Sequence, residues 1–127
     1  MAQHAIEKEI REKARELAED YGADFVAELA GDYLGEAEQR MVRLRQALVN
    51  GDVDAVCYEA HTLKSSSANL GARTFAYLAK QFEEAGHAGN LAVLTDEVEY
   101  FEQQFSEVKS IMKALQSAPD QFLSRER

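Results

Sequence analysis

The chain is poor in the residues that most often interrupt or cross-link a fold. Its 127 residues include one proline, Pro119, one cysteine, Cys57, and no tryptophan. A single cysteine excludes an internal disulfide and a cysteine cluster for structural zinc. No apolar run approaches the roughly 18 residues that a membrane-spanning helix needs. The opening stretch MAQHAIEKEIREK lacks the apolar core of a secretory signal. We therefore expect a cytoplasmic protein of one domain.

Positive charge is also scarce. The chain has 14 lysines and arginines against 23 aspartates and glutamates, which gives a formal net charge of −9 and a pI near 4.8. Such a chain is repelled by nucleic-acid phosphates and by anionic membrane surfaces. We therefore expect neither nucleic acid nor membrane as a partner, whereas protein partners and small ligands stay open.

The residues that are abundant favour helices. Alanine, leucine, glutamate, glutamine and lysine are strong helix formers, and no stretch alternates with the period of two that strands show. This pattern predicts an all-α fold. Glycines and Asn-Gly or Gly-Asn steps divide the chain into five helical segments, at about residues 3–20, 23–49, 52–70, 72–85 and 91–116.

Short connections make successive helices antiparallel neighbours. We therefore expect the last four segments to form an antiparallel up-down four-helix bundle, with the first as an additional N-terminal capping helix. The predicted domain spans residues 1–117. Residues 118–127, behind Pro119, are predicted to form a flexible tail.

Apolar residues at helical spacing predict which side chains form the core. Outside the third segment they are Ile6, Ile10, Ala14, Leu17, Phe25, Val26, Leu29, Tyr33, Ala37, Met41, Leu44, Leu48, Phe75, Leu78, Ala79, Phe82, Leu94, Val98, Phe101, Phe105, Val108, Met112 and Leu115. We interpret the aromatic residues Phe75, Phe82, Phe101 and Phe105 as core residues, in preference to the lining of a cofactor pocket.

The third segment contains a histidine beside its core-facing residues. The core seam steps by four and three residues through Val56, Ala60, Leu63, Ser67 and Leu70. His61 lies about 100° further round the helix, so we expect its side chain at the flank of the bundle. Its neighbours by i+3 and i+4 spacing form what we call the histidine face: Cys57, His61, Lys64, Ser65 and Ala68.

The composition of the histidine face suits a phosphoryl acceptor. Small neighbours let another molecule approach the imidazole of His61. Lys64, one turn away, favours the neutral and nucleophilic ring and would neutralise a phosphoryl group attached to it. The nucleotide-binding motif G-x-x-x-x-G-K-[ST] is missing, so we expect a phosphoryl carrier without an ATP site of its own, and not an enzyme. The simpler alternative is a solvent-facing histidine on an ordinary helix.

Residues 60–72, AHTLKSSSANLGA, resemble the signature of histidine-containing phosphotransfer (HPt) domains, which is close to A-H-x-L-K-G-S-S-x-x-L-G-A. The positions that match are His61, Leu63, Lys64, Ser66, Ser67, Leu70, Gly71 and Ala72. The resemblance extends over about residues 5–116. It implies a bundle that shuttles phosphoryl groups between aspartates of receiver domains, which belong to response regulators or to hybrid histidine kinases.

The resemblance also implies roles for particular residues. His61 would be phosphorylated on Nε2, Lys64 would stabilise the phosphoryl group, and Gly71 would end the histidine helix. A glutamine or glutamate on the following helix would support the imidazole, and both Gln81 and Glu83 are candidates. No intrinsic cofactor is implied, because the divalent metal is expected on the partner receiver.

The chain departs from the family pattern at Ser65, where the family usually has glycine. The Ser65 hydroxyl could donate a hydrogen bond to the phosphoryl oxygens. We expect receiver docking on the exposed rim formed by Ser65, Ala68 and Asn69, together with residues of the neighbouring long helix. A monomer is expected, since four amphipathic helices close their own core.

Other readings remain open. The chain could be an adaptor bundle that is not phosphorylated, or the phosphoacceptor domain of a chemotaxis-type kinase. Cys57 and His61, at i and i+4, could begin a metal site. The remaining ligands are lacking, because His4 lies in the capping segment and His87 in the loop GHAGN, where we expect it to be solvated. The simplest role for Cys57 is that of a small packing residue.

Overall fold

The computed structural model describes residues 2–125, with side chains from Ala5 onward, and within that range its regular structure is entirely helical. The all-α prediction is thus confirmed. The helices are α1 (Ala2–Tyr21), α2 (Ala23–Val49), α3 (Val53–Asn69), α4 (Arg73–His87), α5 (Leu91–Ser117) and α6 (Pro119–Ser124). Among the described residues, none of these helices has both the length and the apolar character needed to cross a membrane.

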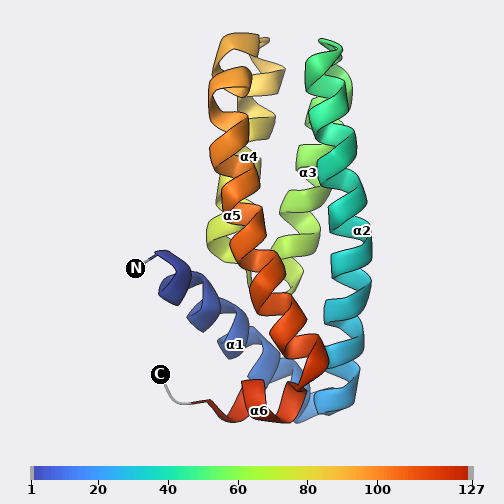
Figure 1. Cartoon of the computed structure of the whole chain (residues 1–127), viewed down its shortest axis with the longest axis vertical. Coiled ribbons are helices and arrows are strands. Elements are labelled where there is room, and N and C mark those ends of the chain that lie inside the picture. Colours follow the sequence, from blue (N-terminus) through green and yellow to red (C-terminus); the bar gives the residue numbers. More distant parts are fainter. Residues whose placement is uncertain (1, 126–127) are drawn as a thin grey trace.

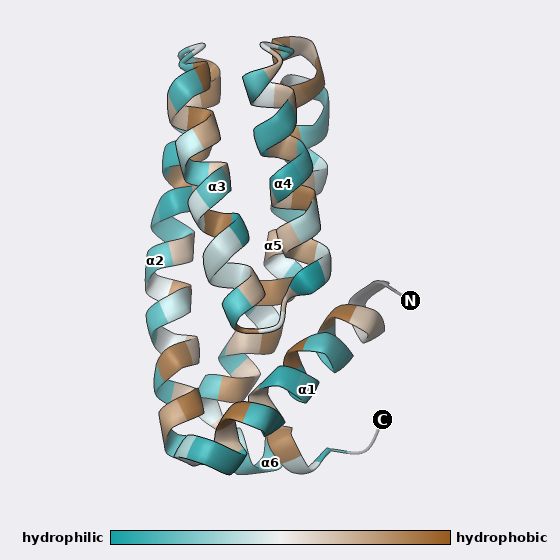
Figure 2. Cartoon of the chain, turned by 180° about the vertical axis from the view of Figure 1, so that it is seen from behind, coloured by the Kyte–Doolittle hydropathy of each residue, from teal (hydrophilic) through white to brown (hydrophobic). Residues whose placement is uncertain are grey.

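Helices α2, α3, α4 and α5 lie side by side along the long axis of the molecule (Figure 1). In that view α2 rises from the lower end, α3 descends, α4 rises again and α5 returns downward. The most extensive contact is between α3 and α4, and α2 contacts both α5 and α3. Seen from behind, α3 and α4 are in front (Figure 2), while α1 and α6 lie at the lower end.

The helices begin and end close to the predicted positions, because local side-chain and backbone signals set their ends. The side chain of Asp52 accepts a hydrogen bond from the backbone of Ala55 at the start of α3, and Asn90 does the same for Val93 at the start of α5, both at 3.2 Å. Gly71 follows α3 with φ of 86°, a left-handed conformation that glycine adopts without strain. The predicted end of the histidine helix at Gly71 is confirmed.

The core is built from the predicted apolar positions with one clear exception. The rings of Phe75 and Phe82 each lie 4.9 Å from that of Phe101 in stacked pairs, and all three side chains are buried. Phe25, in contrast, is 41% exposed, so its assignment to the core was wrong. It lies in the first turn of α2, where its ring packs on that of Tyr21 instead of the bundle interior.

The structure also differs from the prediction of a flexible tail behind Pro119. Pro119 occupies the first turn of α6, a position that its fixed φ favours. The side chain of Phe122 is only 1% exposed, and the guanidinium of Arg11 lies 4.6 Å from its ring. The backbone oxygens of Phe122 and Leu123 accept hydrogen bonds from Arg11 and Arg15, at 3.0 and 2.7 Å. Residues 119–124 are therefore packed on α1, and residues 126–127 lie outside the described part.

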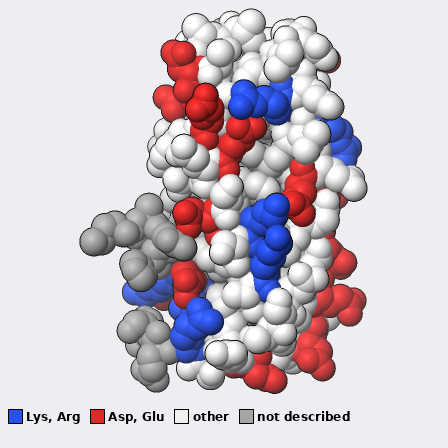
Figure 3. Space-filling model, in the orientation of Figure 1, with Lys and Arg blue, Asp and Glu red and all other residues white. Residues whose placement is uncertain are grey.

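On the face that carries α5 and α2, acidic and basic side chains are interspersed (Figure 3). Two ion pairs join these helices, Arg45 with Glu102 at 3.0 Å and Lys109 with Glu38 at 2.5 Å. Partly exposed pairs of this kind contribute at most about 1 kcal/mol each. The apolar contacts beneath them are therefore the main link between α2 and α5.

Candidate functional site

His61 lies in the middle of α3, at the edge of its buried seam. Val56, Ala60 and Leu63 on that helix are 0% exposed, whereas the side chain of His61 is 58% exposed. The predicted position of the histidine at the flank is confirmed. The ring is open to another molecule on one side and faces α4 on the other.

The carboxylate of Glu83, on α4, holds the groups around His61 together. Its Oε2 lies 2.9 Å from Nδ1 of His61 and 3.4 Å from Nε2 of His87. Its Oε1 accepts a hydrogen bond from the ammonium of Lys64 at 3.1 Å. We call these four residues the Glu83 cluster: His61, Lys64, Glu83 and His87. The side chain of Glu83 is 14% exposed, so it forms the floor of the site.

Two opposing effects act on the pKa of Glu83. Burial raises the pKa, but the hydrogen bonds and charges of Lys64 and His61 outweigh burial and bring the pKa below its ordinary value. The carboxylate is therefore ionised at neutral pH and acts as an acceptor. A neutral His61 ring accordingly donates its Nδ1 proton to Glu83, and Nε2 keeps a free lone pair.

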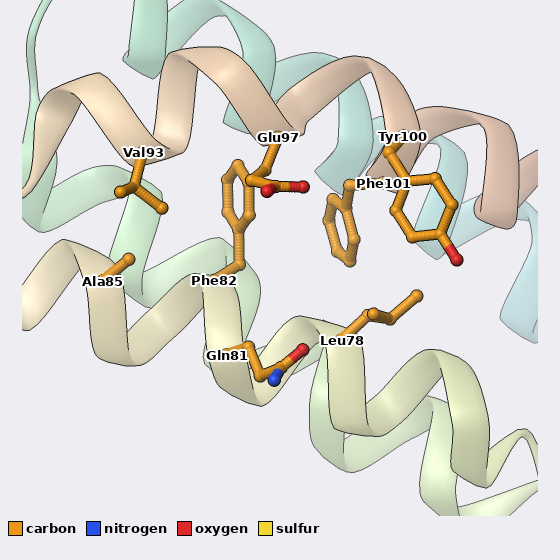
Figure 4. A pocket seen from close by; sticks show the side chains of 8 residues that line it. All are labelled: Leu78, Gln81, Phe82, Ala85, Val93, Glu97, Tyr100 and Phe101. Carbon is orange, nitrogen blue, oxygen red and sulfur yellow. The ribbon is translucent and has the colours of Figure 1, made fainter.

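Gln81, the other candidate for supporting the imidazole, lies on the opposite side of α4. Two residues along a helix turn through about 200°, so Gln81 and Glu83 cannot both face α3. Gln81 instead borders a groove of about 330 Å³ between α4 and α5 (Figure 4). The other residues that line it are Leu78, Phe82, Ala85, Val93, Glu97, Tyr100 and Phe101. The structure thus brings Glu83, and not Gln81, to the histidine.

The three consecutive serines of α3 have different surroundings. Ser65 is exposed, as are Ala68 and Asn69 further along the helix. The hydroxyl of Ser66 donates back to the carbonyl of Thr62 at 3.1 Å. The hydroxyl of Ser67 is buried and instead forms a hydrogen bond with that of Tyr33 on α2, at 2.8 Å. Only Ser65 is therefore available to a docking partner.

Cys57 is not on the open part of the histidine face. It is 7% exposed, and a Cβ built on Gly86 would lie only 2.5 Å from its Sγ, so α3 and α4 approach closely there. Burial, together with the charges of Glu83 and Asp54, raises the pKa of the Cys57 thiol. The protonated, enclosed thiol is a packing group and a poor nucleophile.

His87 lies in the helix and not in the loop that we predicted. It is the last residue of α4, with a side chain that is 66% exposed and one turn beyond Glu83. The sequence signal that could have placed it is the i, i+4 spacing of the two residues. The side chain of His4 lies outside the described residues. Within the described part of the chain, no three His, Cys, Asp or Glu side chains are grouped to hold a metal ion.

An ion pair that the sequence did not predict lies beside the site. Arg40 on α2 reaches Glu59 on α3 at 2.9 Å, and Glu59 is buried despite its charge. The guanidinium of Arg40 lies 5.8 Å from the ring of Tyr58, which is 62% exposed and one turn before His61. Complementary charge on two helices was the only sequence signal for this pair. Through Arg40, α2 therefore lies at the edge of the histidine face.

Comparisons with known proteins agree with this geometry. The model of one family, described as the Hpt domain, matches residues 28–118. A search of curated proteins gave no match. Among solved structures, histidine-containing phosphotransfer protein B (HptB) from Pseudomonas aeruginosa PAO1 is similar, with a TM-score of 0.74 and 27% sequence identity. The similarity covers 81% of this chain and 90% of that one.

Proposed function

Because the chain belongs to the Hpt domain family, with a histidine phosphotransfer role in two-component signalling, we propose that His61 is the residue that carries the phosphoryl group. One observation supports this choice above the others. The Nδ1 of His61 is 2.9 Å from a carboxylate, while the ring is 58% exposed. A carboxylate on one nitrogen and access to the other is the arrangement that an imidazole nucleophile needs.

The proposed transfer starts from the neutral His61 ring. Its Nε2 lone pair attacks the phosphorus of a receiver's phospho-aspartate. The N–P bond forms, the bond between phosphorus and the aspartate oxygen breaks, and the aspartate leaves as a carboxylate. The Nδ1 proton stays in place, so the phosphorylated ring is cationic and its hydrogen bond to Glu83 becomes charge-assisted. The reverse sequence passes the group to the aspartate of a second receiver.

Lys64 has a supporting role in this proposal. Its ammonium is held by Glu83 at 3.1 Å, and its side chain is 31% exposed. From there it can offset the negative charge of a phosphoryl group on the neighbouring ring. Glu83 therefore orients two groups, the nucleophile and the cation that stabilises its product.

We propose receiver domains of response regulators or hybrid histidine kinases as the partners, docking over Ser65, Ala68 and Asn69. These three residues are exposed and have short side chains. The receiver would supply the divalent metal, and this chain would need no ATP site. The cytoplasm is the proposed location, and a monomer the proposed state. We further take α2 to α5 as an antiparallel up-down four-helix bundle, capped by α1.

The test is phosphorylation from a receiver. The protein is incubated with several phosphorylated receiver domains, and the phosphoryl linkage formed is examined for acid lability and base stability. We expect label on the wild-type protein and none on His61→Gln. Since His61 is largely exposed, the variant should keep the wild-type melting temperature, which excludes unfolding as the cause.

Two other results would point elsewhere. Absence of label with every receiver would favour the adaptor alternative. Label that requires a separate ATP-binding kinase domain, and that no receiver can supply, would favour the phosphoacceptor domain of a chemotaxis-type kinase.

A further inference from the structure

The proposed function uses His61, Lys64 and Glu83 but gives no role to His87. That residue lies one turn beyond Glu83 on the same helix, and its side chain is 66% exposed. Its Nε2 lies 3.4 Å from Oε2 of Glu83, the oxygen that is also 2.9 Å from Nδ1 of His61. Two imidazoles therefore share one carboxylate oxygen.

Sharing of this oxygen makes the two rings interdependent. A neutral His87 is a weak neighbour of Glu83 at 3.4 Å. A protonated His87 is an opposite charge at i+4 and lies in the last turn of α4, where the helix dipole also favours a cation. Protonation would thus draw Oε2 toward His87. The Nδ1 hydrogen bond of His61 would weaken, and the Nε2 lone pair would become a poorer nucleophile.

The other charged groups nearby do not replace His87 in this arrangement. On α3, Lys64 bonds to the other carboxylate oxygen, Oε1, and Asp54 acts on Cys57. On α4 itself, Glu84 is exposed next to Glu83. On α5, Glu97 borders the groove that contains Gln81, on the far side of α4. The contact between α1 and α4 joins Glu9 to Thr74, at the opposite end of α4.

We infer that His87 is a positioning residue, which acts on His61 through Glu83 and makes phosphotransfer slower in acid than it would be with a neutral side chain at residue 87. The inference rests on the proposed function of His61. Two changes at residue 87 distinguish this inference. Removal of the positive charge should change the transfer rate at low pH, and a permanent positive charge should change it at high pH.

The experiment compares transfer rates from one phosphorylated receiver to the wild type, His87→Gln and His87→Lys between pH 5.5 and 8.5. Dividing each variant's rate by that of the wild type removes the receiver's own pH dependence. His87→Gln should match the wild type at pH 8.5 and be about threefold faster at pH 5.5. His87→Lys should be about threefold slower at pH 8.5 and approach the wild type at pH 5.5. Rate ratios that do not vary with pH would overturn the inference.

A second measurement separates this inference from the function itself. Nitrogen-15 NMR of the imidazole rings reports which nitrogen of His61 carries the proton. In the wild type, the Nδ1–H signature of His61 should change as His87 titrates, and in His87→Gln that step should disappear. Identical titration curves in the wild type and His87→Gln would refute the role of His87, even if transfer occurs. An absence of transfer would count only against the proposal that His61 carries the phosphoryl group.

Discussion

At the scale of single residues, the site depends on one carboxylate more than on the histidine alone. Glu83 accepts hydrogen bonds from side chains on α3 and lies beside a third basic group on α4. An ionised acceptor makes each of these bonds stronger than a neutral one would be. The ionisation of Glu83 should therefore be visible in both the stability and the chemistry of the protein.

Replacement of Glu83 by glutamine should cost about 1 kcal/mol of stability at pH 7, because the side chain keeps its size and loses its charge. The folded-state pKa of Glu83 lies below its ordinary value of 4.5, so its contribution is complete above pH 4.5 and is lost as pH falls through the lowered value. Urea denaturation of wild type and Glu83→Gln should show a smaller difference at pH 3.5 than at pH 7.

The matched control is Glu84→Gln, the exposed neighbour on the same helix. Its stability should stay within about 0.5 kcal/mol of the wild type. An unchanged stability difference between wild type and Glu83→Gln at the two pH values would show that the charge of Glu83 does not stabilise the fold.

Ser65 is the residue at which the chain departs from the family pattern, and two substitutions separate its possible contributions. Ser65→Ala removes the hydroxyl and keeps a helix former, whereas Ser65→Gly also costs about 1 kcal/mol of helix stability. If the hydroxyl donates to the phosphoryl oxygens, both variants should shorten the lifetime of phosphorylated His61 a few-fold, measured as loss of label. Lifetimes equal to that of the wild type in both variants would rule out the hydrogen bond.

The residues of the site were only partly predictable. The flank position of His61 followed from its 100° offset from the seam, because that offset is a local property of the helix. The choice between Gln81 and Glu83 could not be made, since it depends on which side of α4 faces α3. The ion pair of Arg40 with the buried Glu59 depends on the register between two helices, which no local pattern encodes.

At the scale of helices, the seam between α3 and α4 sets the distance between His61 and its carboxylate. These two helices pack closely where Gly86 meets Cys57. An alanine Cβ at residue 86 would lie 2.5 Å from the sulfur, so the Cys57 side chain or one of the two helices must shift. We expect Gly86→Ala to lower the free energy of unfolding by about 1–3 kcal/mol.

Gly35→Ala is the control, because Gly35 is also within a helix but a Cβ there meets nothing within 4 Å. This substitution should stabilise the protein by about 0.5–1 kcal/mol, as is usual when alanine replaces an exposed helical glycine. Addition of Cys57→Ala to Gly86→Ala should restore part of the lost stability, measured by urea denaturation. Equal stabilities of the two glycine variants would contradict close packing at Gly86.

Most helix boundaries were predicted to within two residues, since glycine, asparagine and aspartate mark the ends of the helices. The predicted end of α4, at Ala85, lies two residues before the observed end at His87, because glycine is typical of a helix end and Gly86 is instead inside the helix. Gly86 lies inside the helix. Its lack of a side chain allows α4 to pack closely against Cys57 and does not mark a turn. The sequence alone does not distinguish a glycine that ends a helix from a glycine that allows close helix packing. Only the tertiary contact does.

At the scale of the whole molecule, α6 closes the end formed by α1 and the lower ends of α2 and α5. Phe122 is buried there, and Arg11 lies over its ring. Phe122→Ala should destabilise the protein by about 3–5 kcal/mol, the usual cost of deleting a buried aromatic ring. Gln121→Ala, at the exposed neighbouring position, should have almost no effect. A flexible tail, as expected from the sequence, would instead make both substitutions neutral in urea denaturation.

The sequence contains a signal for α6, Pro119, that is compatible with two different structures. The prediction placed the end of regular structure before Pro119, but proline is also favoured in the first turn of a new helix. What keeps this six-residue helix folded is its contact with Arg11 and Arg15, more than a hundred residues away along the chain. Short helices have little stability alone, so only tertiary contacts could decide this case.

The exposure of Tyr58 has a practical consequence for optical measurements. The chain contains no tryptophan, and Tyr58 lies one turn from His61 with 62% of its surface exposed. A single tryptophan placed there, Tyr58→Trp, would dominate the emission spectrum of the protein and would be the fluorophore nearest to the histidine. Docking of a receiver without tryptophan would shift that emission to shorter wavelengths. Binding could thus be followed in real time, without a radioactive phosphoryl group.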